Sequence, residues 1–442
     1  MRSRLLYLGL ASVAVAALGS CNWGKFDDLK DDAWAQLIDR DDSGVSGDFG
    51  IDVCAVPTTG SQGGVRFVIS AGLTAGLAQA TFDENGDLID TIGFDGDASG
   101  AGQIRPIRTT NSTPFVVIPY KDNTFLAGIP DQKIVAEYET GLQNGRAIVE
   151  GGVDRTGEAL AVGDLGVGTA TLDVVAVSGS SVIVLPDGSS TGAFSCALRP
   201  PRKNGTPPLV PLENVKIARM AGGTGAGQII IAGEDQETAT PRIYILDASQ
   251  VQGAGGADCP TGASFVVTAP APGSIAVADI DGNGPLDIIA GTLGQSSAAG
   301  RVTVYLNPSS GTPTPVEITS ELDDKSSPLR GSRIRVANID EDAASEIIVG
   351  DAAGSPDNVS AAGQVQLFRW GSSGSCPEQR GPACLVRTIF DPDPDTNGFF
   401  GRALAIGQFK KGAATSNVLA VAQKDQVVVY FRVSTADQDP RN

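Results

Sequence analysis

Short apolar runs separated by turn-forming residues dominate the hydrophobic pattern of this chain. Most runs are five to eight residues long, and Gly, Pro, Asp and Asn stand between them. The clearest pair is SIAVADI at 274–280 and LDIIAG at 286–291. Runs of this length with turn residues on both sides are typical of β-strands rather than of long helices. The pattern therefore predicts an all-β fold.

The unit around Asp279 recurs along the chain. Its equivalent positions are Asp164, Arg219, Asn338 and Gln408, so successive units are 55, 60, 59 and 70 residues apart. In each unit a strand rich in small residues precedes a loop, and a second strand follows the loop. A third strand then alternates clearly, and a fourth is less regular. Such a repeat of four antiparallel strands predicts one blade of a β-propeller per unit.

The first strand of each unit has a composition that suits the centre of a propeller. The expected first strands are 158–165, 214–221, 274–280, 332–339 and 401–409. The expected second strands are 172–177, 228–233, 286–291, 345–350 and 417–422. Because innermost strands converge on the axis, Ala and Gly in the first strands let backbones approach one another. Generic packing of small residues in a β-sandwich is the alternative.

Two further units, without the acidic loop, precede these five. Their expected strands are 51–56, 65–70, 76–82, 88–93, 104–109, 114–120, 123–129 and 133–138. The chain therefore predicts a seven-bladed β-propeller of four-stranded antiparallel blades. The last unit has only three strands, and we expect 33–38 to supply the fourth and close the ring, which removes exposed sheet edges. The predicted divisions are a signal peptide at 1–20, an acidic tether with this strand at 21–47, the propeller at 48–434 and a tail at 435–442.

The N-terminus has the layout of an export signal. Arg2 and Arg4 precede an apolar run at 5–18, which is short for a membrane span. The sequence Leu-Gly-Ser-Cys at 18–21 resembles the lipobox of bacterial lipoproteins, in which Cys21 becomes the acylated first residue after cleavage. By the same resemblance, Asn22 rather than Asp after the cysteine favours the outer membrane. An ordinary signal peptide followed by an unmodified cysteine is the alternative.

Composition and charge narrow the function classes. The net charge of −19 argues against nucleic-acid binding, because phosphate contacts need clustered Lys and Arg. The chain has no histidine, which removes the commonest general base and the commonest transition-metal ligand. No G-x-S-x-G motif is present either. We therefore expect a protein that is not an enzyme.

The loop of the Asp279 unit predicts a calcium site. Asp279, Asp281, Asn283 and Asp287 occupy positions one, three, five and nine, and Gly284 at position six allows a sharp turn. With the Pro285 carbonyl as a further ligand, this set suits the six to eight oxygens that calcium prefers. An acidic β-turn without an ion is the alternative.

A second calcium site is predicted at the next loop, with Asn338, Asp340, Asp342 and Glu346 as ligands. We expect the loops at Asp164, Arg219 and Gln408 to hold no ion. The segment 83–87 contains Asn-Gly and predicts a hairpin turn, whereas Asp391, Asp393 and Asp395 alternate with prolines and predict a stiff connector.

Five cysteines follow Cys21, and export would allow disulfides. They are Cys54, Cys196, Cys259, Cys376 and Cys384. The eight-residue separation of Cys376 and Cys384 suits a small closed loop, but the sequence does not determine the connectivity.

The repeats resemble the FG-GAP/VCBS family, whose best-known members are the propellers of integrin α subunits. The resemblance rests on VADIDGNGPLDIIAG at 277–291, VANIDEDAASEIIVG at 336–350, VGDLGVGTATLDVVAV at 162–177 and GFFGRALAIGQF at 398–409. Phe400-Gly401 corresponds to the FG pair, and Asp48-Phe49-Gly50 is an early counterpart. In that family the acidic loops bind calcium and the propellers serve mainly adhesion and recognition of proteins or glycans.

The lipobox resemblance implies a lipid anchor at the bacterial cell envelope, and the FG-GAP/VCBS resemblance implies a calcium-stabilised module that acts in binding, adhesion or as a scaffold. Its expected ligand is a protein or glycan on one propeller face, and its expected membrane contact is the lipid anchor. Two alternatives remain: a propeller enzyme acting on envelope or extracellular polymers, similar to a polysaccharide lyase, and a purely structural envelope lipoprotein.

Overall fold

The structure is a computed structural model of the 442-residue chain. It describes residues 33–43, 49–56, 64–71, 77–94, 105–108, 114–120, 123–128, 146–147, 159–168, 173–178, 181–186, 192–198, 215–221, 225–235, 240–259, 263–267, 272–292, 294, 300–308, 313–318, 327, 330–339, 345–371, 378–380, 382–392, 394–412 and 414–433. The signal peptide, Cys21 and the C-terminal tail therefore lie outside the described residues.

Antiparallel sheets make up nearly all of the described structure. The described strands form seven sheets, six with four strands and one with five. The first three sheets along the chain contain β2 (Phe49–Val56), β3 (Val65–Ala71), β4 (Leu77–Phe82), β5 (Leu88–Phe94); β6 (Arg105–Arg108), β7 (Pro114–Tyr120), β8 (Asn123–Gly128), β9 (Arg146–Ala147); and β10 (Ala159–Gly163), β11 (Asp173–Ser178), β12 (Ser181–Leu185), β13 (Phe194–Ala197).

The next three sheets follow the same order of strands. They contain β14 (Val215–Ala218), β15 (Gln228–Asp235), β16 (Thr240–Asp247), β17 (Ala263–Val266); β18 (Pro272–Ala278), β19 (Asp287–Thr292), β20 (Arg301–Tyr305), β21 (Pro315–Ile318); and β22 (Arg330–Ala337), β23 (Glu346–Asp351), β24 (Gln364–Trp370), β26 (Ala383–Phe390), with β25 (Glu378–Arg380) on the outer edge. The last sheet contains β27 (Ala403–Lys411), β28 (Ala414–Gln423), β29 (Gln426–Val433) and β1 (Ala33–Asp39). Short helices are α2 (Arg40–Ser43), α4 (Ala248–Ala254) and the 3-10 turn η3 (Pro356–Asn358).

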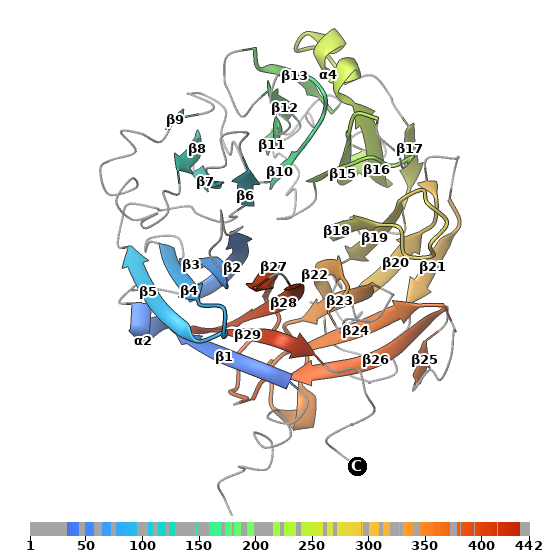
Figure 1. Cartoon of the computed structure of the whole chain (residues 1–442). Helices are drawn as coiled ribbons and strands as arrows, with labels where there is room; N and C mark the ends of the chain where they lie inside the picture. Colours follow the sequence, from blue (N-terminus) through green and yellow to red (C-terminus); the bar gives the residue numbers. More distant parts are fainter. Residues whose placement is uncertain are drawn as a thin grey trace, which may run out of the picture.

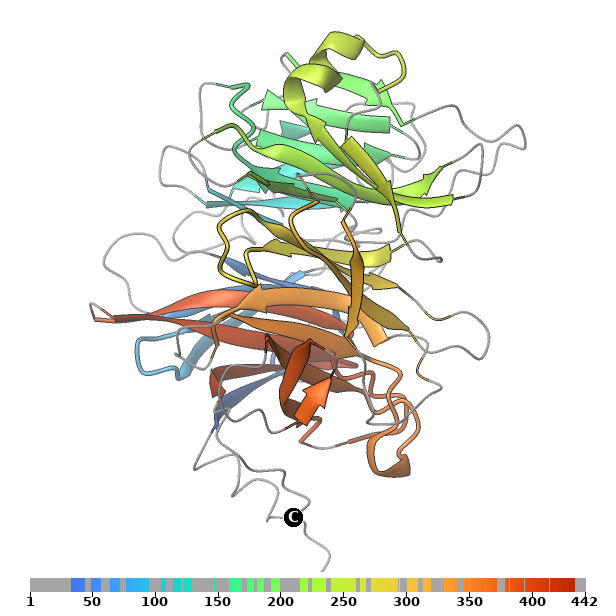
Figure 2. The ribbon, with the colours of Figure 1, turned by 90° about the vertical axis from the view of Figure 1, so that its right-hand side faces the viewer.

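The sheets are arranged around a common axis, as in a β-propeller (Figure 1). The first strands β2, β6, β10, β14, β18, β22 and β27 contact one another in that order, and β27 contacts β2. Each sheet therefore has the expected order, with its first strand innermost and three further strands outside it. Figure 2 shows the assembly from the side, with α4 at one edge of the molecule. Among the described residues, no helix is long and apolar enough to cross a membrane.

The two ends of the described chain meet in one sheet. β1 pairs antiparallel with β29, from Ala33 opposite Val433 to Asp39 opposite Gln426. Arg40 continues this contact, because its backbone N–H donates to the carbonyl of Asp425 at 3.0 Å. The strand expected at 33–38 is present and completes the last sheet.

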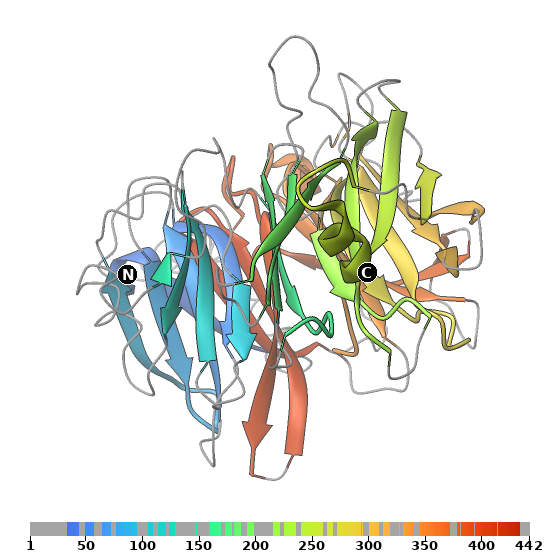
Figure 3. The same ribbon diagram turned by 90° about the horizontal axis from the view of Figure 1, so that it is seen from above.

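Most expected strands begin and end within two residues of the observed ones, but the prediction and the structure differ clearly at two places. The fourth strand expected at 133–138 lies outside the described residues, and the described strand in that place is β9. The loop expected between 409 and 417 is shorter than predicted, because β27 continues to Lys411 and β28 begins at Ala414. In Figure 3 this hairpin of β27 and β28, drawn in red, extends beyond the neighbouring sheets.

The Phe-Gly pairs lie where neighbouring sheets approach each other closely. Phe49 and Phe400 are fully buried, and the glycines after them have positive φ angles of 83° and 89°. A Cβ on Gly50 would lie 2.7 Å from the carbonyl oxygen of Gln423, and one on Gly350 would lie 2.4 Å from that of Gly401. Only glycine combines this backbone conformation with such contacts. The Phe-Gly pair thus has a structural role at the boundary between sheets.

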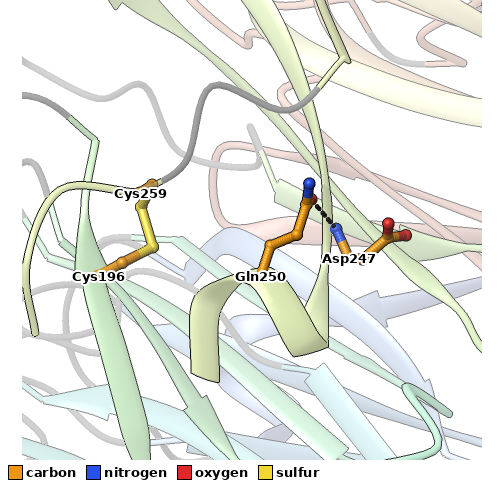
Figure 4. The surroundings of a disulfide bond; sticks show 4 residues. All are labelled: Cys196, Asp247, Gln250 and Cys259. Carbon is orange, nitrogen blue, oxygen red and sulfur yellow. Dashed lines mark hydrogen bonds between the residues drawn. A yellow bond between two sulfur atoms is a disulfide. The ribbon is translucent and has the colours of Figure 1, made fainter. Parts of the chain in front are cut away.

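A disulfide joins the segment between β16 and β17 to β13 of the preceding sheet (Figure 4). Cys196 of β13 and Cys259, which follows α4, are bonded, with their Cα atoms 4.8 Å apart. The backbone of Ala197 accepts from Cys259 at 2.7 Å and donates to Ala257 at 2.9 Å, so this segment covers the outer edge of β13. Cys384 is disulfide-bonded as well, and Cys54 is buried. Covering an edge in this way protects it from pairing with other chains.

Candidate functional site

The loop between β18 and β19 contains the candidate metal ligands. Gly282 and Gly284 have positive φ angles of 74° and 102°, which lets the chain turn twice within six residues. The two carboxylate oxygens of Asp279 accept from the backbone N–H groups of Asn283 at 3.0 Å and of Gly284 at 2.8 Å. The loop therefore folds back on the carboxylate at its own start.

Three carboxylates converge inside this loop. Asp279, Asp281 and Asp287 each place an oxygen within 4.8 Å of the other two. Asp287 is fully buried, Asp279 is half-buried and Asp281 is exposed, so the group is closed toward the sheets and open toward solvent. Asn283 lies against the group and donates from Nδ2 to Asp281 at 2.8 Å. Pro285, the remaining expected ligand, lies half-buried in the same loop.

The carboxylate at the start of the second strand has an architectural role in three sheets. Asp287 Oδ2 accepts from the backbone N–H of Ile280 at 3.1 Å. Asp173 and Glu346, each fully buried at the start of β11 and β23, accept in the same way from Leu165 at 2.9 Å and Ile339 at 3.0 Å. In each of these sheets the buried acid accepts a hydrogen bond from a backbone N–H in the loop after the first strand, and so holds that loop in place. Asp173 was not predicted to have this role, although its position directly before the apolar run VVAV is the signal that identifies it.

The surroundings of Asp287 disfavour its charged form. Burial raises the pKa of Asp287, and the charges of Asp281 and Asp279 raise it further, against hydrogen bonds from Asn307 and Ile280 that lower it. No Lys or Arg forms an ion pair with Asp279, Asp281 or Asp287 in the part of the chain that the structure describes. A cation at this point would relieve the repulsion between the three carboxylates.

The second predicted calcium loop differs at its last ligand. Glu346 Oε1 lies 3.4 Å from Nη2 of Arg369 on β24, so a guanidinium already faces this buried carboxylate. The carbonyl of Asn338 accepts from Asn417 Nδ2 of the neighbouring sheet at 2.7 Å. Asp340 and Asp342 lie outside the described residues. Arg369 was not anticipated from the sequence, because its opposition to Glu346 depends on the register of β23 and β24.

In the loop at Asp164, too, an arginine side chain faces the acid. Arg219 Nη2 of the next sheet lies 2.8 Å from Asp164 Oδ2. The backbone N–H of Gly227 donates to the Asp164 carbonyl at 2.9 Å, and Leu286 donates in the same manner to Met220. Equivalent loops of neighbouring sheets are therefore linked to one another, and the Asp279 loop belongs to this series.

The other two acidic segments carry no described metal-binding geometry. Asp83 lies in the turn between β4 and β5, and its Oδ1 accepts from the backbones of Asn85 at 2.8 Å and Asp87 at 3.0 Å. The prediction of a hairpin turn there is confirmed. Asp391 is buried and Asp395 exposed, whereas Asp393 lies outside the described residues.

Comparisons with known proteins give no family for this chain. No family model matches it, and no curated protein matches it. Among solved structures, one described as "Streptogramin B lyase structure" is similar over 90% of this chain and 97% of the other, with 9% identity and a TM-score of 0.46. A likeness this distant does not extend to activity, and the description of the fold rests on the sheets themselves.

Proposed function

We propose that this chain is a seven-bladed propeller of the FG-GAP/VCBS type whose Asp279 loop binds calcium. The observation that supports calcium is the convergence of Asp279, Asp281 and Asp287 without a cationic side chain in the described residues. Hard oxygen ligands of this kind, one of them buried, suit calcium. In two sibling loops an arginine faces one of the acids instead: Arg219 faces the first acid, Asp164, and Arg369 faces the last acid, Glu346.

The proposed part of calcium is structural rather than catalytic. Leu286, one residue before Asp287, donates its backbone N–H to Met220 of the preceding sheet at 2.9 Å. An ion that holds Asp279 and Asp287 together would therefore also hold the boundary between two sheets. We expect no catalytic activity from this loop, which belongs to a binding or scaffold module.

The proposed location is the bacterial envelope, with Cys21 as the lipidated residue and the outer membrane as the destination. The disulfide between Cys196 and Cys259 supports export, because such bonds persist in oxidising compartments. Acyl chains on Cys21 would anchor the protein at about 0.8 kcal/mol per buried CH₂. Labelling of cells with a radioactive fatty acid tests this: the label should enter the wild-type protein and be absent from Cys21→Ser.

Thermal unfolding with excess calcium and with EDTA tests the metal proposal. Calcium at about one hundred times its dissociation constant should stabilise the fold by about 2.7 kcal/mol. Asp281→Ala should remove most of this gain while leaving the EDTA melt unchanged, because Asp281 is exposed. Asp395→Ala, an exposed acid in another segment, is the matched control and should keep the full gain. Identical melts of the wild-type protein in calcium and EDTA would refute the proposal.

Capture from envelope extracts tests the binding role. The full chain should retain a protein or glycan in calcium and release it in EDTA. A chain that retains nothing under either condition would be a structural lipoprotein instead. Turnover of an envelope polysaccharide would establish the enzyme alternative.

A further inference from the structure

The hairpin of β27 and β28 is longer than the corresponding strand pairs of the neighbouring sheets. Its strands have nine and ten residues, whereas β22 and β23 have eight and six, and β2 and β3 have eight and seven. The pairing runs from Ala403 opposite Ala422 to Lys411 opposite Ala414, and the turn lies at 412–413. The hairpin therefore extends past the ends of the sheets beside it (Figure 3).

Contacts on both sides hold the base of this hairpin. Phe409 is buried in the core. On one side, Asn417 Nδ2 donates to the carbonyl of Asn338 in the neighbouring sheet at 2.7 Å. On the other side, the carbonyl of Lys410 accepts from the backbone N–H of Gly64 at 2.8 Å, and the N–H of Lys410 donates to the Gly64 carbonyl at 3.3 Å. The hairpin is therefore a fixed projection.

The tip of the hairpin carries positive charge only. Lys411 is exposed and Lys410 is half-buried, and their side chains leave opposite faces of β27 because they are consecutive in the strand. Neither lysine forms an ion pair within the described residues. The other exposed residues of the tip are small and uncharged: Gly412, Ala414 and Thr415. The stretch 402–424 contains no Asp or Glu, although the whole chain has 51 acidic and 32 basic residues. The tip is therefore a basic projection on an acidic protein.

Acidic side chains are present at the same end of the propeller, but they lie on other sheets. Because strands alternate in direction, the loops after the first and the third strand of each sheet lie at the end where the hairpin turns. These include the acidic loop at 279–287 and the acidic turn at 83–87. The hairpin extends past the sheets beside it, so a flat surface that approaches this end meets the two lysines first (Figure 3).

The described chain begins at this end of the same sheet. β28 runs away from the hairpin turn, β29 returns toward it, and β1 starts at Ala33, opposite Val433 near the end of β29. The order β1-β29-β28-β27 places Ala33 three strand spacings from β27, which is about 14 Å. Cys21 lies twelve residues before Ala33, a reach of at most about 40 Å. A lipid on Cys21 would therefore keep this end of the sheet near the membrane, although a tether of this length would not orient the propeller.

We propose that the tip of the β27–β28 hairpin docks through Lys410 and Lys411 on the anionic lipid headgroups of the membrane that holds the anchor. This inference rests on the proposed lipid anchor at Cys21 and adds a second contact, which orients the propeller. Two lysines beside an anionic surface should raise the docked population about thirtyfold at low salt. So small an attraction is effective because the anchor already keeps the hairpin close to the surface. Docking leaves the opposite end of the propeller open to a protein or glycan.

A fluorescent dye on the hairpin of the lipidated chain, reconstituted on vesicles, tests the inference. Thr415→Cys provides an exposed thiol for the dye, whereas the free Cys54 is buried. The vesicles consist of phosphatidylcholine alone or of phosphatidylcholine with anionic phosphatidylglycerol. Acrylamide, a neutral quencher, should quench the dye about threefold less on the anionic vesicles, and high salt should remove this difference because it screens the lysines.

Variants in the same labelled background show whether the two lysines cause the shielding. Lys410→Gln/Lys411→Gln should lose it, and Lys410→Arg/Lys411→Arg should keep it. Lys424→Gln is the matched control and should also keep the shielding, because Lys424 is exposed in the turn between β28 and β29 at the opposite end of the sheet. Free quenching on both kinds of vesicle would overturn the inference. Equal shielding on both would overturn it as well, since a protein surface would then cover the hairpin.

Flotation with the neutral vesicles tests the anchor separately, because it does not depend on the lysines. A chain that does not float lacks the proposed lipid on Cys21. A histidine tag in place of residues 1–21 and a nickel-chelating lipid then hold the chain on the same vesicles, and the dye decides the inference about the hairpin alone.

Discussion

Two neighbouring loops of this propeller each contain a buried acid at the same position, but the acid faces different charges in the two loops. The loops at 279–287 and 338–346 each end in a fully buried acid that holds the backbone N–H after the first strand. Glu346 faces Arg369, whereas Asp287 faces Asp279 and Asp281. In the first case an arginine of the protein lies beside the buried acid, and in the second two further acids do. The comparison shows that one residue on a third strand changes the charge that a buried acid of this loop faces.

The largest effect is expected from removing the cation that the protein supplies. Arg369→Met would remove the guanidinium that lies 3.4 Å from the buried Glu346 carboxylate, and should cost about 3 kcal/mol in urea unfolding. Arg301→Met removes an exposed arginine from β20, the equivalent strand of the neighbouring sheet, and should cost far less. Adding Glu346→Gln to Arg369→Met should recover part of the loss. Equal costs for the two arginine variants would break the comparison.

The next largest effect is expected on the stabilisation by calcium, which should depend on the loop at 279–287 and not on the loop at 338–346. Asp281→Ala should remove most of a gain of about 2.7 kcal/mol, reached at about one hundred times the dissociation constant. Asp342→Ala, its counterpart in the second loop, should leave that gain nearly intact, because Arg369 already neutralises Glu346. Differential scanning calorimetry with calcium and with EDTA measures both. A large loss of the gain in Asp342→Ala would show that the second loop binds calcium too.

A smaller effect is expected from placing an arginine beside Asp287, as Arg369 lies beside Glu346. Leu306 directly follows Tyr305, the last residue of β20, which lies opposite Ile288. Extending this register by one residue places Leu306 opposite Asp287, as Arg369 lies opposite Glu346. Leu306→Arg should stabilise the EDTA form by about 1 kcal/mol and reduce the calcium gain by a similar amount. Leu306→Met keeps the shape without the charge and should do neither. A full calcium gain in Leu306→Arg would contradict this account.

The smallest effect is expected at Asp83, a carboxylate that hydrogen bonds within its own turn stabilise. Desolvation acts to raise the pKa of Asp83, but hydrogen bonds from Asp87, Asn85 and Gly86 outweigh it and lower the pKa below its usual value. A lowered pKa gives stability that is present above the unfolded value of 3.8 and is lost as pH falls through the folded value. Asp83→Asn should therefore show a slightly shallower loss of melting temperature below about pH 4, with no response to calcium. A calcium response lost in this variant would assign an ion to the turn.

The sequence predicted local structure well and relations across sheets poorly. Strand positions followed from apolar runs and turn residues, so even the closing strand at 33–38 was found. The Asp279 loop was identifiable because its ligands lie within nine residues of one another. The ion pairs of Arg369 and Arg219 were not predicted, because Arg369 reaches its carboxylate across strand pairing and Arg219 across a sheet boundary. The hairpin at Gln408 was misread because a continued strand and a loop have similar composition there.

The pairing of β1 with β29 has a consequence for the order of folding. Strands separated by nearly the whole described chain must meet before the last sheet is complete. Contacts this distant in sequence form slowly, because a long stretch of chain must be ordered before they are gained. Until β29 has been synthesised, its partner β1 has an unsatisfied edge, and partly made chains are at risk of pairing with one another. A chain destined for transport across a membrane would gain from this delay, since it remains unclosed until its last strands are available.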